Sequence, residues 1–119
     1  VRAGGGARDC GAGPLAKLYT DMGGESLYFG KPHPPIYDLA RLRLAGLQLL
    51  SSEPRIICIG DGIGTDVLGG VQEDLDTLFI TGGLAAAETK TVDQPDADAL
   101  TSYLEKEIMS PTYAIGFLR

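Results

Sequence analysis

The stretch RIICIGDGIGTDVLGG, residues 55–70, places an apolar run directly before an acidic, glycine-rich turn. The run Ile56–Ile59 is short and rich in β-branched side chains, which is typical of a strand buried on both faces of a parallel sheet. The strand stops at Gly60, so Asp61 lies on the loop at its carboxyl end. The other glycines of this loop allow a tight turn, because glycine adopts positive φ freely.

The residues after this turn predict a helix that begins near Thr65 or Asp66. Side chains of these types accept hydrogen bonds from the free amides of a first helical turn. Asp61 and Asp66 are therefore two carboxylates, five residues apart, where a strand gives way to a helix. Open α/β sheets bind their ligands at this edge, so the stretch predicts a functional site.

Length and composition predict one folded domain. The chain has 119 residues, 44% hydrophobic side chains and a formal net charge of −6. This is enough for a packed core but short for a two-domain enzyme. Lys and Arg are not clustered, so neither nucleic acid nor an anionic membrane is expected as a main partner. With no apolar run of membrane-spanning length and no leader sequence, a cytoplasmic location is expected.

The two cysteines, Cys10 and Cys58, are far apart in the sequence and form no CxxC pair. Zinc binding and dithiol redox chemistry therefore have no support. Cys58 lies inside the apolar run and is interpreted as a small buried hydrophobic residue. The default expectation is a reducing, cytoplasmic setting.

The chain alternates between strands and helices. The expected elements, in order, are a glycine-rich loop over 1–14, a helix over 14–22, a strand over 26–29, a proline-rich loop over 31–35, a leucine-rich helix over 36–50 that supplies core, the central strand over 56–59, a helix over 65–73, a strand over 76–80, a short helix over 84–89, a helix from 94–96 to about 109, and a last strand within 111–119. This alternation predicts an α/β fold with a mainly parallel sheet.

Glycine turns follow three of these expected strands, at Gly30-Lys31, Gly60-Asp61 and Thr81-Gly82-Gly83. In a parallel sheet all three turns open on the same edge, so a lysine, two aspartates and several backbone amides share one crevice. Carboxylate oxygens suit Mg²⁺, and a lysine can neutralise phosphate oxygens. The pattern favours phosphoryl transfer assisted by Mg²⁺.

Each residue also has a purely structural interpretation. Asp66 could be an acid favoured by a helix dipole, Asp61 a turn residue, and Lys31 a surface lysine. His33, the one histidine, lies between prolines and is not expected to be catalytic. Neither a GxGxxG fingerprint nor a P-loop is present with the required spacing.

Three segments together carry a family resemblance: YFGKPHPPIYDLA (28–40), IICIGDGIGTDVLGG (56–70) and DTLFITGGL (76–84). They resemble the haloacid dehalogenase-like (HAD) superfamily, and in particular its IIA branch of sugar-phosphate, nucleotide and pyridoxal-phosphate phosphatases. The likeness covers roughly residues 10–119. Within it, GAGPLAKLYTDMGG (11–24) is similar to the closing helix of the cap domain inserted in that branch.

This resemblance implies a Rossmann-like core and hydrolysis of phosphate monoesters through an aspartyl-phosphate. The family's nucleophile is the first aspartate of a DxDG motif, and a Ser/Thr holds the phosphoryl group. Lys31 matches the lysine of the GKP motif and would balance charge on nucleophile and phosphate. Asp61 matches the direct Mg²⁺ ligand, and Asp66 the acid that orients metal-bound water or the lysine. The implied substrate is a small phosphorylated metabolite.

The departures from the family pattern are equally informative. No DxDG motif occurs: Asp9 and Asp21, which precede Lys31, have neither the motif nor a buried strand before them. The Ser/Thr region and most of the cap are also missing. The resemblance therefore implies a carboxyl-terminal portion, with 1–25 the end of the cap and linker and 26–119 half of the core.

A chain without the nucleophile is not expected to hydrolyse a phosphate ester by itself. The alternative hypothesis is a non-catalytic α/β module that binds a partner, a metal or its own copy, with a homodimer formed through the uncovered sheet. A flavodoxin-like domain shares the βα pattern but does not account for the GKP motif.

Overall fold

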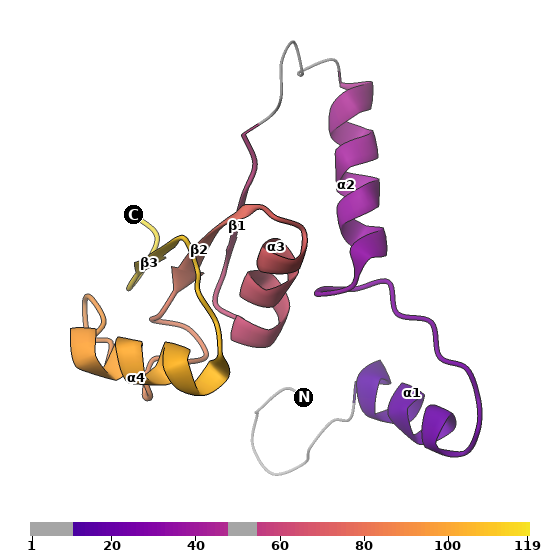
Figure 1. The fold of residues 1–119 in the computed structure, drawn as a ribbon, viewed down its shortest axis with the longest axis horizontal. Helices are drawn as coiled ribbons and strands as arrows, with labels where there is room; N and C mark the ends of the chain where they lie inside the picture. Colours follow the sequence, from indigo (N-terminus) through magenta and orange to yellow (C-terminus); the bar gives the residue numbers. More distant parts are fainter. Residues whose placement is uncertain (1–10, 48–54) are drawn as a thin grey trace.

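The structure is a computed structural model that describes residues 11–47 and 55–119. The elements in chain order are α1 (Ala12–Asp21), α2 (Pro34–Gly46), β1 (Ile57–Gly60), the π-helix η1 (Ile63–Val67), α3 (Leu68–Gln72), β2 (Asp76–Ile80), α4 (Ala97–Glu107) and β3 (Tyr113–Ile115) (Figure 1). The strands form one parallel sheet in the order β1-β2-β3. This confirms the predicted α/β fold. No helix of the described residues is both long and apolar enough to cross a membrane.

One face of the sheet is covered by α3 and α4. A Cβ atom placed on Gly70 of α3 would lie 2.5 Å from Thr77 Cγ2 and 3.0 Å from Cys58 Cβ, so the helix sits directly on the strands. On the same face Phe79 is fully buried, with its ring 6.1 Å from that of Tyr103 in α4. The core consists of Val67, Phe79 and Ala85, with Ile63, Leu100, Tyr103, Leu104 and Met109 packed against it.

The prediction that the central strand is buried on both faces is wrong, because the face of β1 that points away from α3 and α4 is exposed. Ile57 and Ile59 are 44% and 47% exposed. The reason is topological: α3 and α4 lie on the same face, and β1 is an edge strand of this sheet. Within the described residues no helix covers the face that carries these two isoleucines.

Two expectations for the amino-terminal part are also wrong. The segment 26–29 is not a strand, and its Leu27 and Phe29 side chains are 73% and 65% exposed. A strand requires a neighbour to satisfy its backbone groups, and the described sheet offers none here. The leucine-rich helix α2 has no buried residue. Its end at Gly46 precedes the predicted end, and residues 48–50 lie outside the described part, as do Cys10 and most of the predicted loop over 1–14.

Residues 84–89 form successive turns instead of the predicted helix. The Thr89 amide donates to the Ala85 carbonyl at 2.9 Å, as in a helix, but the Thr91 amide reaches back to the Ala86 carbonyl at 2.9 Å. The Thr89 hydroxyl also donates to the Ala85 carbonyl at 2.7 Å. Such local side-chain bonds compete with helical ones, and Lys90, with φ of 50°, ends the helical geometry.

The carboxyl-terminal elements agree with the sequence. Asp96 caps α4 by accepting a hydrogen bond from the Ala99 amide at 2.9 Å, as its residue type favours. Ile108 ends the helix in the left-handed conformation, with φ of 53°. The chain then returns as β3, which confirms the predicted last strand.

Candidate functional site

Asp61 directly follows β1 and faces the turn that follows β2. Its Oδ2 accepts a hydrogen bond from the Leu84 amide at 3.1 Å. A Cβ atom on Gly83 would lie 2.1 Å from the same oxygen, so only glycine leaves room for this carboxylate. The parallel pairing of β1 with β2 brings the two turns to one edge, as the sequence predicts.

Asp66 lies in the first turn of η1, and its side chain folds back toward the end of β1. The helix begins at Ile63, earlier than predicted, with Gly62 as its cap. Asp66 Oδ2 accepts a hydrogen bond from the Gly62 amide at 3.0 Å, and its Oδ1 forms an ion pair with Lys31. A Cβ atom on Gly60 would lie 2.2 Å from Asp66 Cγ, so this acid also depends on an adjacent glycine.

Lys31 reaches the same edge from the turn before α2. Its side chain is 54% exposed, whereas that of its partner Asp66 is 12% exposed. The hydrogen bond to Asp66 raises the pKa of Lys31 above its usual value, and the negative charge of Asp61 acts in the same direction. The structure thus places all three predicted residues at one sheet edge, with Lys31 and Asp66 in direct contact.

His33 lies close to Lys31 in sequence but takes a different role. Its ring stacks on that of Tyr28, with centroids 4.9 Å apart and planes at 27°. Its amide donates to the Gly30 carbonyl at 3.0 Å. These contacts stabilise the turn that carries Lys31.

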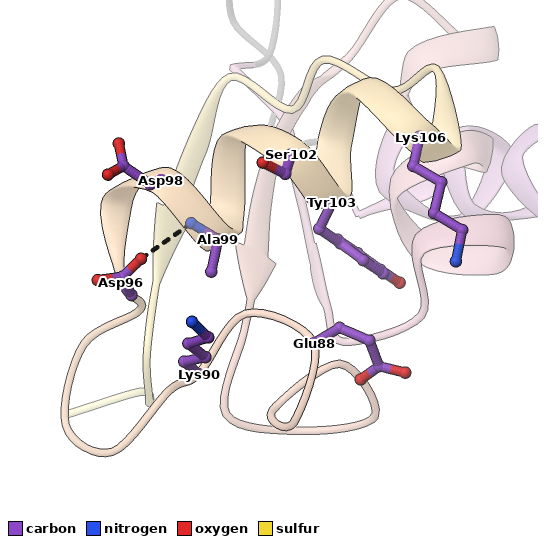
Figure 2. A pocket seen from close by; sticks show the side chains of 8 residues that line it. All are labelled: Glu88, Lys90, Asp96, Asp98, Ala99, Ser102, Tyr103 and Lys106. Atoms are coloured by element: carbon purple, nitrogen blue, oxygen red, sulfur yellow. Dashed lines mark hydrogen bonds between the residues drawn. The ribbon is translucent and has the colours of Figure 1, made fainter.

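Two hollows lie near these elements, and only one contains a predicted residue. A cavity of about 330 Å³ at the carboxyl ends of β1 and β2 is lined by Asp61, with Ile59, Gly60, Ile80, Gly82, Gly83, Phe117 and Leu118. A hollow of about 650 Å³ lies between α4 and the turns over 84–90, where Figure 2 shows Lys90 and Lys106 among Glu88, Asp96 and Asp98. The smaller cavity adjoins the candidate site, because Asp61 lines it, whereas Lys31 and Asp66 are not among its lining residues.

The donor atoms fit a magnesium ion. The described residues hold no group of three or more His, Cys, Asp or Glu side chains placed to bind a metal. Mg²⁺, however, keeps several waters and commonly takes only one or two protein carboxylates. Both oxygens of Asp66 bond protein groups, whereas Asp61, within residues 11–47 and 55–119, bonds through Oδ2 alone. This geometry makes Asp61 the better candidate for a direct ligand.

Cys58 lies within β1, shortly before Asp61 in the chain, on the face of the strand that α3 covers. Burial raises the pKa of its thiol above the usual value. Near pH 8 the folded chain therefore holds less thiolate than an unfolded one, and thiolate is the reactive form. In a Cys10→Ser variant we expect iodoacetamide to alkylate Cys58 several-fold more slowly in buffer than in urea, measured by intact mass. The Cys58 side chain is only partly buried, and equal rates in the two conditions would contradict even this partial protection.

Sequence reasoning identified the glycine turn after β2 but not what it does. The Leu84 amide holds Asp61, and no side-chain pattern marks a backbone donor. The one available signal is the pair Gly82-Gly83 at a strand end, since paired glycines indicate a close approach.

Comparison with known proteins gives a consistent result. The family model described as HAD-hydrolase-like matches residues 28–106. A haloacid dehalogenase-like hydrolase from Brucella suis 1330 is 35% identical, with a TM-score of 0.64 over 91% of this chain and 37% of its own. An NPPase from Geobacillus stearothermophilus, solved as a thermostable double mutant, is 26% identical, with a TM-score of 0.55 over 87% of this chain and 33% of its own.

A possible sugar phosphatase of the HAD superfamily from Cytophaga hutchinsonii shares the fold, with a TM-score of 0.62 at 23% identity, over 90% of this chain and 35% of its own. A search of the curated proteins finds no significant match. The chain spans about a third of the length of these solved structures.

Proposed function

The chain belongs to the HAD-like hydrolases, and from that premise we propose that it is the carboxyl-terminal portion of a Mg²⁺-dependent phosphatase of the IIA branch. The observation that carries this proposal is the convergence of Lys31, Asp61 and Asp66 at one edge of a parallel sheet. Lys31 comes from a different segment of the chain than the two aspartates, and a purely structural role for each residue does not require the lysine to meet them.

The proposed reaction is hydrolysis of a phosphate monoester. A carboxylate supplied by an amino-terminal DxDG segment attacks phosphorus, the bond to the ester oxygen breaks, and water then hydrolyses the aspartyl-phosphate. Bound at Asp61, Mg²⁺ would neutralise charge on the phosphoryl oxygens. Lys31 places a positive charge at the same edge, and Asp66 holds both Lys31 and the Gly62 amide in position.

The proposed division of the chain assigns 1–25 to the end of a cap and its linker, and 26–119 to half of a core domain. Two observations support it. Figure 1 shows α1 set apart from the sheet and joined to α2 by an extended segment. The exposed isoleucines Ile57 and Ile59 of β1 are the surface that the other half of the core would cover. A small phosphorylated metabolite as substrate and a cytoplasmic setting complete the proposal.

The test is a chimera in which the amino-terminal part of the Brucella suis hydrolase precedes this chain, replacing the region to which it aligns. Phosphate release from a panel of phosphate monoesters is measured with Mg²⁺ and with EDTA. We expect activity in the chimera with Mg²⁺ and none in the 119-residue chain alone. A folded chimera that is inactive where the full Brucella protein is active would refute the proposal, and so would hydrolysis by the short chain.

A second function is favoured by the uncovered face of β1. An open strand edge beside an apolar face is a template for pairing with another chain, and a second copy would make a non-catalytic homodimer. Light scattering on a size-exclusion column tests this self-association. A dimer that Ile59→Lys converts to a monomer would support self-association through this face, and a monomer at high concentration would exclude it.

A further inference from the structure

The turns over 81–91 are held together by hydrogen bonds among three threonine side chains, Thr81, Thr89 and Thr91, which we call the threonine cluster. Thr81 and Thr89 are both 0% exposed. The Thr91 hydroxyl donates to Thr81 Oγ1 at 2.8 Å and lies 2.7 Å from Thr89 Oγ1. Buried hydroxyls are stable only when hydrogen-bonded, so this cluster closes the loop and limits its conformations.

The beginning of the same loop, at Gly83 and Leu84, faces Asp61. The Leu84 side chain is 79% exposed, and it is the Leu84 amide that donates to Asp61 Oδ2, at 3.1 Å. The three atoms nearest to a Cβ on Gly83 all belong to Asp61, at 2.1 to 2.6 Å. The backbone of Gly83 does not have the left-handed φ that favours glycine. The close approach of Asp61 is therefore the feature that requires a glycine at this position.

We propose that Gly83 and the Leu84 amide are positioning residues for Asp61, with the threonine cluster fixing where that amide lies. Gly83 leaves space for the carboxylate and the amide holds Oδ2, so that Oδ1 is presented to a cation at the sheet edge. A carboxylate held in this way has little rotamer freedom left to lose when it binds. This inference rests on the proposed function, because it assigns a purpose to the Mg²⁺ site.

The experiment compares Gly83→Ala with Gly64→Ala in the 119-residue chain. The two variants make the same change in the segments that follow β2 and β1, but Gly64 lies in η1 and a Cβ on it meets nothing within 4 Å. The first readout needs no metal: the Leu84 amide, which donates to Asp61, should exchange with solvent more slowly in the parent chain and in Gly64→Ala than in Gly83→Ala. The remaining amide shifts should be retained in all three proteins as the measure of folding.

The second readout is Mg²⁺ binding by calorimetry, with Asp61→Asn as the reference for a lost ligand. Groups that orient metal ligands typically contribute 10- to 100-fold to metal affinity, so Gly83→Ala should weaken binding by about tenfold or more, and Gly64→Ala should not weaken it. Loss of binding in Asp61→Asn but not in Gly83→Ala would overturn the positioning role and leave the proposed function intact. Equal binding in all four proteins would refute the magnesium site itself, and equal exchange of the Leu84 amide in the parent chain and in Gly83→Ala would overturn the positioning role directly.

Discussion

Replacement of Asp61 by asparagine is expected to lower the Mg²⁺-dependent turnover of the chimera by about 10²- to 10³-fold, the usual effect of removing one electrostatic contact to a transition state. Asparagine has nearly the same shape as aspartate, and its carbonyl oxygen can still accept from the Leu84 amide. The substitution therefore removes charge with little change in position. Since Mg²⁺ prefers charged oxygen ligands, both metal affinity and turnover should fall, as measured by phosphate release over a Mg²⁺ titration.

The matched control is Asp76→Asn, which makes the same change in charge at the other end of the sheet. Asp76 begins β2 and is exposed, whereas Asp61 follows the end of the neighbouring strand. We expect this variant to retain the turnover of the chimera. Equal losses in the two variants would show a general charge effect, and near-normal turnover in Asp61→Asn would refute its assignment as the metal ligand.

The part of the fold that the sequence predicts well is the part governed by local rules. Strand β2 has the predicted bounds, Asp76–Ile80, because an apolar run between turn residues has few other structures open to it. The site follows from the same logic. Parallel strands end at one edge, so glycine turns after β1 and β2 are brought together whatever their other neighbours are.

The predictions that failed depend on what lies next to an element, and periodicity does not contain that information. The apolar run of β1 is equally compatible with one buried face or two, and the structure leaves Ile57 and Ile59 exposed because both helices cover the other side. The turns over 84–89 have helical composition, yet the Thr91 amide reaches back to the Ala86 carbonyl and Lys90 adopts a positive φ, so the backbone leaves the helical path. The hydrogen bond from the Leu84 amide to Asp61 could not be predicted, since every residue except proline carries a backbone N–H and the residue type does not reveal which one makes the contact.

The two carboxylates are distinguished by their partners more than by their positions in the sequence. Asp66 bonds a cation and an amide, so both of its oxygens are occupied by groups of the protein. Asp61 bonds one amide through one oxygen. A direct ligand needs an oxygen available to the metal, and a supporting acid needs fixed partners. In the proposed site these partners favour Asp61 as the direct ligand, which is the assignment that the family resemblance also implies.

Lys31→Met is expected to lower turnover strongly while changing the free energy of unfolding only slightly. The Lys31–Asp66 pair is half exposed on the lysine side, so its contribution to the free energy of unfolding should be no more than about 1 kcal/mol. In the chimera the same substitution should lower turnover by about 10²-fold or more, because it removes a positive charge from the site of phosphoryl transfer. The two quantities are measured by urea denaturation and by phosphate release.

The effect of pH on this variant follows from the raised pKa of Lys31. A lysine whose folded-state pKa is raised stabilises the fold at pH values below its unfolded pKa of about 10.4, and this stabilisation is lost as the pH rises through the folded value. The difference in unfolding free energy between wild type and Lys31→Met should therefore be constant between roughly pH 6 and pH 9 and decline only at higher pH. A difference that changes within that window would assign the titration to another group.

Lys17→Met is the control for a simple loss of an ion pair, since Lys17 pairs with Asp21 on the exposed surface of α1, with side chains 74% and 57% exposed. Both variants lose one lysine charge and one salt bridge. If Lys31 were only a surface lysine, the two would behave alike in both assays. A loss of turnover confined to Lys31→Met, at similar stability, requires that its charge acts on the reaction, because the ion pair itself contributes too little free energy to explain a 10²-fold effect, which corresponds to about 2.8 kcal/mol.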